Sequence, residues 1–312
     1  MQRPVPDRSV VYYSLLPFLL ARETSYNIEA KELNLLKSGA SRKKEKSRLR
    51  RIIWLVIGLI LLLLAYLILG IQWMRYTAQR AGLVDPTSSY RETLGGQGPC
   101  PPLTVVVLGD STAIGTGTSA RNQTFSYQLI RENLLTIYSQ VNYINLAVSG
   151  AVIKEVADEQ LLRMFAQSPG DSRKPDLILI SIGANDVTGL TSAGDFSAKL
   201  AQVLDKLTQD TQAQIVLLGV PAVYSAPVLL PLFPSLLDGF THRLIEAEDQ
   251  LLTRYPTNRI RKVDIYNTTG PLFKNHPEYF AADGYHPNDK GYAAWTKEIA
   301  KILPPEIAQK RC

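Results

Sequence analysis

The stretch LTVVVLGDSTAIGTG, residues 103–117, decides the fold, because a valine-rich apolar run ends abruptly in Gly-Asp-Ser. Short, continuous apolar runs are typical of strands that are buried on both faces of a parallel sheet. A strand that ends in small residues and a serine fits three interpretations: a phosphate-binding loop, a nucleophile on a turn, or an ordinary strand end. The rest of the chain discriminates between them.

Similar apolar runs recur along the chain between helical patterns. We expect strands at residues 103–108, 143–146, 177–182, 215–220 and 260–265. We expect helices at residues 126–139, 152–166, 196–210, 240–255 and 290–302. This alternation predicts an α/β domain with a parallel sheet covered by helices on both faces. In such sheets the ligand crevice lies at the carboxyl ends of the strands.

Residues with catalytic chemistry follow these strand ends. Ser111 follows the first strand, Gly150 the second and Asn185 the third, while Asp283 and His286 precede the last helix. A neutral histidine can remove the proton of a serine hydroxyl, and a carboxylate on its other nitrogen fixes its tautomer. Backbone N–H groups in tight turns and an asparagine amide can stabilise an oxyanion, at about 3 kcal/mol for each donor. The pattern favours the nucleophile interpretation.

The motifs GDST, GAND and DGYHPN, in this order, resemble those of the SGNH hydrolase family, also called GDSL esterases and lipases. The resemblance implies Ser111 as nucleophile, His286 as base and Asp283 as the acid that orients it. It also implies an oxyanion hole formed by Ser111, Gly150 and Asn185. The fold it implies is a three-layer α/β/α sandwich, flavodoxin-like, with a five-stranded parallel sheet. A threonine follows the serine where the family name has leucine, which bears on the subfamily.

Other kinds of site fit the sequence poorly. GTGTSA, residues 115–120, matches a dinucleotide fingerprint, but its glycines lie too far beyond the strand and no acidic residue ends the second strand. Neither a Walker P-loop nor a G-x-S-x-G elbow occurs, and no His/Cys cluster suggests a metal site. His242 lies in a helical pattern and His276 in a loop without a carboxylate three positions earlier.

Residues 52–71 form an uncharged stretch of 20 residues, of which 15 are Ile, Leu or Val. At 1.5 Å per residue, a helix of this length spans about 30 Å, the thickness of the hydrocarbon core of a bilayer. On the insertion scale these 15 residues contribute about −6 kcal/mol. A core helix seldom lacks a polar face over such a length, so we expect a transmembrane helix.

Charge is distributed unevenly on the two sides of this stretch. Residues 1–51 carry 12 Lys and Arg against five Asp and Glu, while the remaining residues carry 22 against 23. The positive-inside rule therefore places the N-terminus in the cytoplasm and the larger part of the chain outside. A nearly neutral folded domain argues against nucleic acid as a partner. The long preceding region and the lack of an A-x-A site argue against a cleaved signal peptide.

The sequence thus predicts a single-pass membrane protein with four parts: a basic cytoplasmic tail (1–51), a transmembrane helix (52–72), a linker (73–102) and an extracytoplasmic SGNH hydrolase domain (103–312). Both cysteines, Cys100 and Cys312, are expected at the sheet end opposite the site. In an oxidising compartment they are candidates for a disulfide.

We therefore expect a membrane-anchored serine esterase that needs no cofactor. Its expected partners are the bilayer, through residues 52–71, and an ester substrate. The expected location suggests acyl groups on envelope glycans or lipids. Two alternatives stay open, namely acyl transfer by the same site and a non-catalytic domain that binds glycan or lipid.

Overall fold

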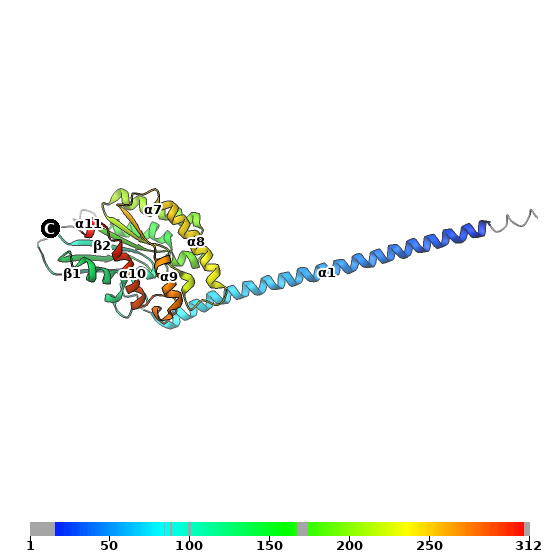
Figure 1. Ribbon diagram of the computed structural model, residues 1–312, viewed down its shortest axis with the longest axis horizontal. Helices are drawn as coiled ribbons and strands as arrows, with labels where there is room; N and C mark the ends of the chain where they lie inside the picture. The colour runs from blue at the N-terminus through cyan, green and yellow to red at the C-terminus, as the bar shows by residue number, and fades with distance from the viewer. Residues whose placement is uncertain (1–15, 84, 88, 99–100, 167–173, 309–312) are drawn as a thin grey trace, which may run out of the picture. The chain divides into compact units, whose positions relative to one another are not determined.

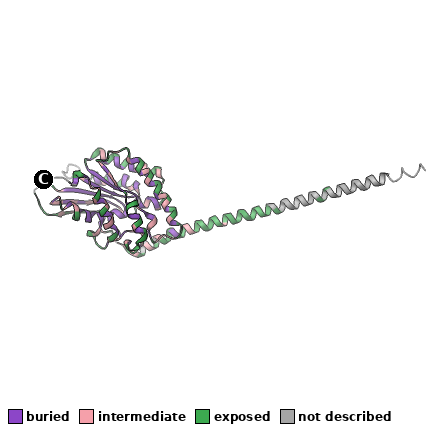
Figure 2. Cartoon of the chain, viewed as in Figure 1, coloured by how far each residue is buried: buried purple, intermediate pink, exposed green. Residues whose placement is uncertain are grey.

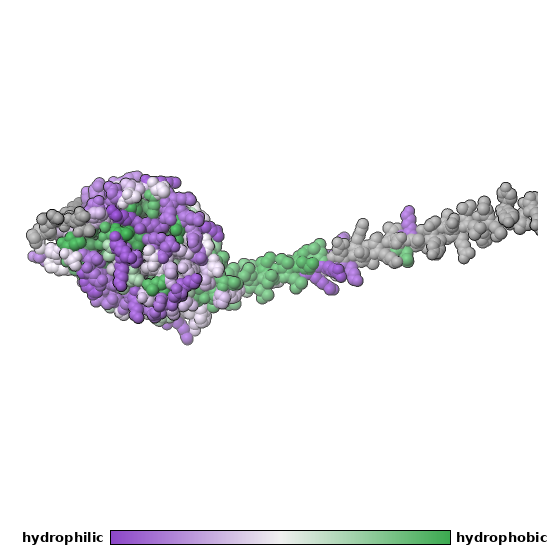
Figure 3. Space-filling model, viewed as in Figure 1, coloured by the Kyte–Doolittle hydropathy of each residue, from purple (hydrophilic) through white to green (hydrophobic). Residues whose placement is uncertain are grey.

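The computed structural model describes residues 16–83, 85–87, 89–98, 101–166 and 174–308. The chain divides into two units, Met1–Leu69 and Gly70–Cys312. The described part of the first unit is helical and belongs to α1 (Leu16–Ala81). Within α1 the segment Lys46–Met74 is long and apolar enough to cross a membrane. Figure 3 shows a continuous hydrophobic surface over most of this segment, with hydrophilic side chains at its N-terminal end. The segment is therefore a candidate membrane anchor.

The second unit is built on a six-stranded sheet with the order β1-β3-β2-β4-β5-β6. Its strands are β1 (Tyr90–Gly95), β2 (Leu103–Gly109), β3 (Gln140–Asn145), β4 (Leu177–Ser181), β5 (Gln214–Leu218) and β6 (Ile260–Val263). Strands β2 to β6 are parallel, and β1 pairs antiparallel with β3. The predicted α/β class and its five parallel strands are confirmed.

The predicted count of five strands was one short, because β1 lies in the segment expected to be a linker. Its six residues, YRETLG, alternate between half-buried and exposed side chains. Such a strand carries no buried apolar run, and it forms because β3 offers a free edge, with Tyr90 opposite Asn145. Edge strands of this kind are commonly short and charged. Pairing with β3, which begins 50 residues later in the chain, therefore determines that residues 90–95 form a strand.

Helices cover both faces of the sheet (Figure 1). One layer contains α7 and α8, which pack on each other, and the other contains α3, α9 and α10, with α10 in contact with both α3 and α9. The helices of this unit are α2 (Ser111–Ile114), α3 (Phe125–Leu129), α4 (Ile153–Glu155), α5 (Leu161–Ala166), α6 (Ala184–Thr188), α7 (Ala193–Asp210), α8 (Phe233–Leu252), α9 (Ile265–Asn275), α10 (Asp289–Lys301) and α11 (Pro305–Ala308). Single turns are η1 (Arg121–Gln123), η2 (Ile130–Leu134), η3 (Val156–Gln160), η4 (Val223–Ser225) and η5 (Pro277–Tyr279).

The core lies on both faces of the central strands. All seven residues of β2 are buried, and the strands are buried throughout the centre of the sheet in Figure 2. Val105 and Val107 share one apolar cluster with Phe125 of α3 and Trp295 of α10. Because side chains alternate along a strand, Val106 faces the other helix layer. Burial on both faces explains why β2 reads as a continuous apolar run.

Several helices differ from the sequence prediction. Helix α9 was not predicted, because Pro271 lies inside it, and proline normally interrupts helices. The helix expected at residues 240–255 begins earlier, at Phe233. The helices expected at 126–139 and 152–166 contain the π turns η2 and η3. The predicted cysteine pair, Cys100 and Cys312, lies outside the described residues and stays a prediction.

Candidate active site

The turn after β2 presents the side chain of Ser111. Gly109 has a φ of +135°, and a Cβ built on it would lie 1.8 Å from the carbonyl oxygen of Ser181, so glycine is required here. Asp110 caps α2, because its Oδ1 accepts hydrogen bonds from the backbone N–H of Thr112 at 2.8 Å and from its hydroxyl at 2.6 Å. Ser111 is thereby held as the first residue of α2, at the carboxyl end of the central strand.

His286 connects Ser111 to Asp283 through two hydrogen bonds. Its Nε2 lies 2.8 Å from Oγ of Ser111, and its Nδ1 lies 2.6 Å from Oδ2 of Asp283. His286 and Asp283 belong to the loop before α10, and Gly284 between them has a φ of +65°. The turn at Gly284 folds the carboxylate back onto the imidazole. The structure thus brings three of the predicted site residues into direct contact.

The surroundings of Asp283 keep its carboxyl group charged. Burial by itself would raise the pKa of Asp283. The hydrogen bond and charge interaction with His286, together with the N–H groups of Tyr285 and His286 at 3.0 Å each, outweigh burial and hold this pKa below its usual value. A carboxylate next to Nδ1 favours a proton on that nitrogen and leaves Nε2 free to accept one from Ser111.

Two neighbouring turns carry the predicted oxyanion donors. Asn185 lies in α6, directly after β4, and its Nδ2 donates a hydrogen bond to the carbonyl oxygen of Ala151 at 3.0 Å. This bond ties α6 to the turn at Gly150, whose φ is +80°. Within the described part of the chain, the N–H groups of Ser111 and Gly150 have no protein acceptor, and Asn185 keeps a second amide hydrogen. These donors are available to a ligand.

Two buried carboxyl groups support the same turns. Asp110 holds α2, and Oδ2 of Asp186 accepts the backbone N–H of Ile153 at 3.0 Å. Burial raises the pKa of Asp110 and that of Asp186 to about 6 each, against the lowering effect of these hydrogen bonds. Among the described residues, the second carboxyl oxygen of each has no partner. Both side chains therefore shape the turns through hydrogen bonds from inside the domain.

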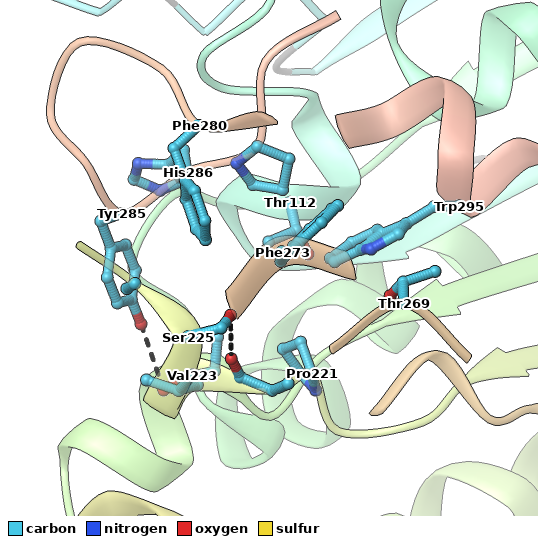
Figure 4. A pocket seen from close by; sticks show the side chains of 14 residues that line it. Thr112, Pro221, Val223, Ser225, Thr269, Phe273, Phe280, Tyr285, His286 and Trp295 are labelled. Atoms are coloured by element: carbon cyan, nitrogen blue, oxygen red, sulfur yellow. Dashed lines mark hydrogen bonds between the residues drawn. The ribbon is translucent and has the colours of Figure 1, made fainter. Parts of the chain in front are cut away.

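A small apolar cavity lies beside His286 (Figure 4). Its volume is about 30 Å³, which is room for about two water molecules. Phe273 of α9 and Trp295 of α10 contribute to its walls, as does Tyr285. The ring of Tyr285 packs edge-on against the imidazole of His286, with 5.2 Å between the ring centroids. This contact restricts the orientation of the imidazole.

The other two histidines take no part in this arrangement. Nδ1 of His242 lies 2.9 Å from the carbonyl oxygen of Asp238, one turn earlier in α8. Nδ1 of His276 lies 2.8 Å from the carboxylate of Glu278. In the part of the chain that the structure describes, no group of three or more His, Cys, Asp or Glu side chains is arranged to hold a metal ion.

Two residues near the site escaped the sequence analysis. Gln160 is fully buried and makes two hydrogen bonds with the backbone of Gly109, which lies 51 residues away. No motif marks Gln160, because its contact forms only when η3 packs against β2. Tyr285, in contrast, stands inside the quoted motif DGYHPN next to His286, and that position could have singled it out.

The sequence profile of the GDSL-like Lipase/Acylhydrolase family matches residues 107–294, more than half of the chain. The chain belongs to this family. The matched region begins inside β2 and ends inside α10, so it contains all five predicted site residues of this GDSL-family protein. The family membership predicted from the motifs is confirmed.

Comparisons with individual proteins agree with this membership. The chain is 28% identical over 214 residues to the GDSL-like esterase Rv1075c of Mycobacterium tuberculosis (strain ATCC 25618 / H37Rv). That alignment covers 66% of this chain and 63% of the relative. The fold is similar to that of a lipolytic G-D-S-L family member from Veillonella parvula DSM 2008, at 15% identity and a TM-score of 0.51 over 64% of this chain and 98% of that one. It is also similar to TesA, at 20% identity and a TM-score of 0.50 over 65% and 98%.

Proposed function

We propose that this GDSL-family protein is a serine hydrolase of carboxylic esters. The observation that carries the proposal is the continuous hydrogen-bonded chain from Ser111 Oγ through His286 to Asp283. A serine, a histidine and a buried carboxylate in this order form the arrangement that activates a hydroxyl for attack on a carbonyl carbon. Family membership supports the same chemistry.

In the proposed acylation step, Oγ of Ser111 attacks the ester carbonyl carbon while Nε2 of His286 takes the hydroxyl proton. Asp283 stabilises the imidazolium that forms, because its carboxylate accepts the Nδ1 hydrogen bond. The N–H groups of Ser111 and Gly150 and the amide of Asn185 stabilise the negative charge on the carbonyl oxygen. The intermediate collapses as His286 returns the proton to the leaving alcohol.

In the proposed second step, water attacks the acyl group on Ser111, and His286 again takes and returns the proton. The acid leaves and the serine hydroxyl is restored, without any cofactor. A sugar hydroxyl in place of water would make the same site an acyltransferase. Comparing the rate of acid release with and without sugar acceptors separates the two reactions, because a transferase forms a new ester at the expense of the acid.

We also propose that residues 52–71 anchor the protein in a membrane, with the N-terminus in the cytoplasm and the catalytic domain outside. The apolar segment of α1 and the basic residues before it support this placement. An extracytoplasmic esterase at the membrane meets acyl groups on envelope glycans and lipids, which we propose as the substrate class. A screen of p-nitrophenyl esters by chain length, alongside acetylated polysaccharides, identifies the acyl group and the alcohol.

The decisive experiment compares the full-length protein with Ser111→Ala and Asp283→Asn. We expect Ser111→Ala to lose both ester hydrolysis and labelling by a fluorophosphonate. We expect Asp283→Asn to lower kcat by about 10⁴-fold, because the imidazole is then held in the wrong tautomer. Hydrolysis that survives in Ser111→Ala would overturn the proposal. A wild-type protein that binds glycan or lipid, yet neither reacts with the probe nor hydrolyses any ester, would instead be a binding domain.

A further inference from the structure

Gln160 bonds to the strand that leads into the Ser111 turn. It is fully buried at the end of η3. Its Oε1 accepts the backbone N–H of Gly109 at 2.8 Å, and its Nε2 donates to the carbonyl oxygen of the same residue, also at 2.8 Å. Both backbone groups of Gly109 are therefore bound by a single side chain, two residues before Ser111.

The Gln160 amide binds Gly109 just beyond the point where the β2–β3 pairing ends. Strand β3 ends at Asn145, which pairs with Val107, but the chain that follows it still donates the N–H of Val148 to the carbonyl oxygen of Gly109 at 3.1 Å. On the opposite side, Gly109 lies next to Ser181 of β4. A buried N–H group without an acceptor costs about 1–3 kcal/mol. The Oε1 of Gln160 supplies this acceptor, and its Nε2 is a second donor to the carbonyl oxygen that the N–H of Val148 also binds.

The segment that ends at Gln160 begins at the other half of the site. Gly150 starts it, the carbonyl oxygen of Ala151 accepts the hydrogen bond from Asn185, and the N–H of Ile153 donates to Asp186. Gln160 then attaches the far end of the segment to Gly109. One short segment is thus bonded to the residues after β4 and to the end of β2. The hydrogen bonds of this segment thus connect the turn at Gly150, where the segment begins, to the turn at Ser111, which follows Gly109.

We propose that Gln160 is a positioning residue for the hydrolase site, which fixes the Ser111 turn relative to the Gly150 turn. The proposal rests on the proposed function, because it concerns the geometry of the oxyanion hole. Gln160 does not touch the substrate and acts through Gly109. Small displacements of reacting groups lower rates by up to about 10²-fold, so loss of the Gln160 bonds acts on kcat rather than on KM.

The test uses two substitutions of different chemistry in the full-length protein. Leucine in Gln160→Leu has a similar size but removes both hydrogen bonds, and we expect kcat to fall by about 10- to 100-fold with KM changed less than about twofold. In Gln160→Glu the protonated carboxyl group can still accept from and donate to Gly109, whereas the carboxylate can only accept. Burial raises the pKa of such a group. The ratio of its kcat to that of the wild type is therefore expected to fall as the pH rises.

Gln214→Leu is the matched control. Gln214 is buried at the first residue of β5, at the opposite end of the parallel strands from Ser111. We expect this variant to keep the wild-type kcat whatever it does to the melting temperature. A merely structural role for Gln160 would give a Gln160→Leu protein with lower stability and an unchanged kcat at temperatures where it is folded, and that result would overturn the proposal.

Two further comparisons keep the outcomes separate. If Gln160→Leu does not fold, Gln160→Glu decides: a kcat ratio that falls with pH supports positioning, and a ratio that is constant with pH overturns it. Ser111→Ala distinguishes the two proposals from each other. If Ser111→Ala is inactive while Gln160→Leu has the wild-type kcat, only the positioning role is lost. If Ser111→Ala is active, the proposed function is lost as well.

Discussion

At the scale of single residues, the turn at Ser111 depends on a carboxyl group that has no contact with solvent. Asp110 is fully buried, and its Oδ1 accepts both hydrogen bonds from Thr112. Burial raises the pKa of Asp110 from 3.8 to about 6. The folded protein therefore holds this proton more tightly than the unfolded chain does, so ionising Asp110 destabilises the folded state.

Asp110→Asn tests this effect through the pH dependence of stability. The folded-state pKa is raised, so the wild type loses stability as the pH rises from about 4 to about 6, and the loss is constant above that range. Asparagine has no charge but keeps an oxygen for Thr112. We expect the variant to become more stable relative to the wild type by about 2 kcal/mol in free energy of unfolding when the pH is raised from 4 to 7. Urea unfolding at pH 4 and at pH 7 measures the free energy of unfolding of both proteins. If the variant and the wild type differ by the same amount at both pH values, the prediction is wrong.

At the scale of elements, the start of α10 holds the loop that carries Asp283 and His286. Oδ1 of Asn288 caps the helix by accepting the N–H groups of Lys290 and Gly291. Its Nδ2 donates to the carbonyl oxygens of Glu278 and Phe280 at 2.9 Å each. Loop and helix are further joined by the bridge between Phe280 and Pro287. One side chain thus connects a helix terminus to the position of the proposed base.

Asn288→Ala is expected to affect both stability and catalysis. Loss of a helix cap costs about 1 kcal/mol, and loss of the two loop bonds loosens the segment that carries His286. We expect a lower melting temperature together with a kcat reduced by about tenfold. Ser192→Ala is the control, since Ser192 caps α7 through the N–H of Asp195. It should lose similar stability at full kcat, and an equal kcat in both variants would refute the link to catalysis.

At the scale of the whole molecule, the chain combines a long apolar helix segment with a compact α/β unit. The excess of basic over acidic residues lies before the apolar stretch, and the rest of the chain is nearly neutral. This charge distribution supports the proposed single-pass topology. It also favours the apolar segment, rather than the net charge of the rest of the chain, as the part that would hold the protein at a membrane in the proposed topology.

The double substitution Leu61→Arg, Leu63→Arg tests the anchor. Each arginine near the centre of the span costs about 3 kcal/mol and each lost leucine about 0.5 kcal/mol, which together cancel the insertion free energy of the stretch. We expect the wild type to resist carbonate extraction and the variant to appear in the soluble fraction. Alanine at both positions should leave the protein in the membrane. A double-arginine variant that still resists extraction would argue against a spanning helix.

Features that depend on a local pattern of residues could be predicted from the sequence. The five parallel strands could be predicted because burial on both faces demands continuous apolar runs, and α10 because its pattern has a helical period. The candidate site could be predicted because a parallel sheet gathers its carboxyl strand ends at one edge, which places Ser111 and Asn185 together, and because the motif DGYHPN before the last helix marks His286. The apolar stretch 52–71 needs no tertiary information at all.

Tertiary structure decided the features that depend on partners far along the chain. Strand β1 exists because β3 leaves an edge open, and α9 forms although Pro271 lies inside it. The bonds between Gln160 and Gly109 join residues 51 positions apart, and no spacing rule could have found them. Local sequence reports which face of a segment must be buried. It does not report which distant backbone group a buried amide will meet, because only packing brings the two within reach.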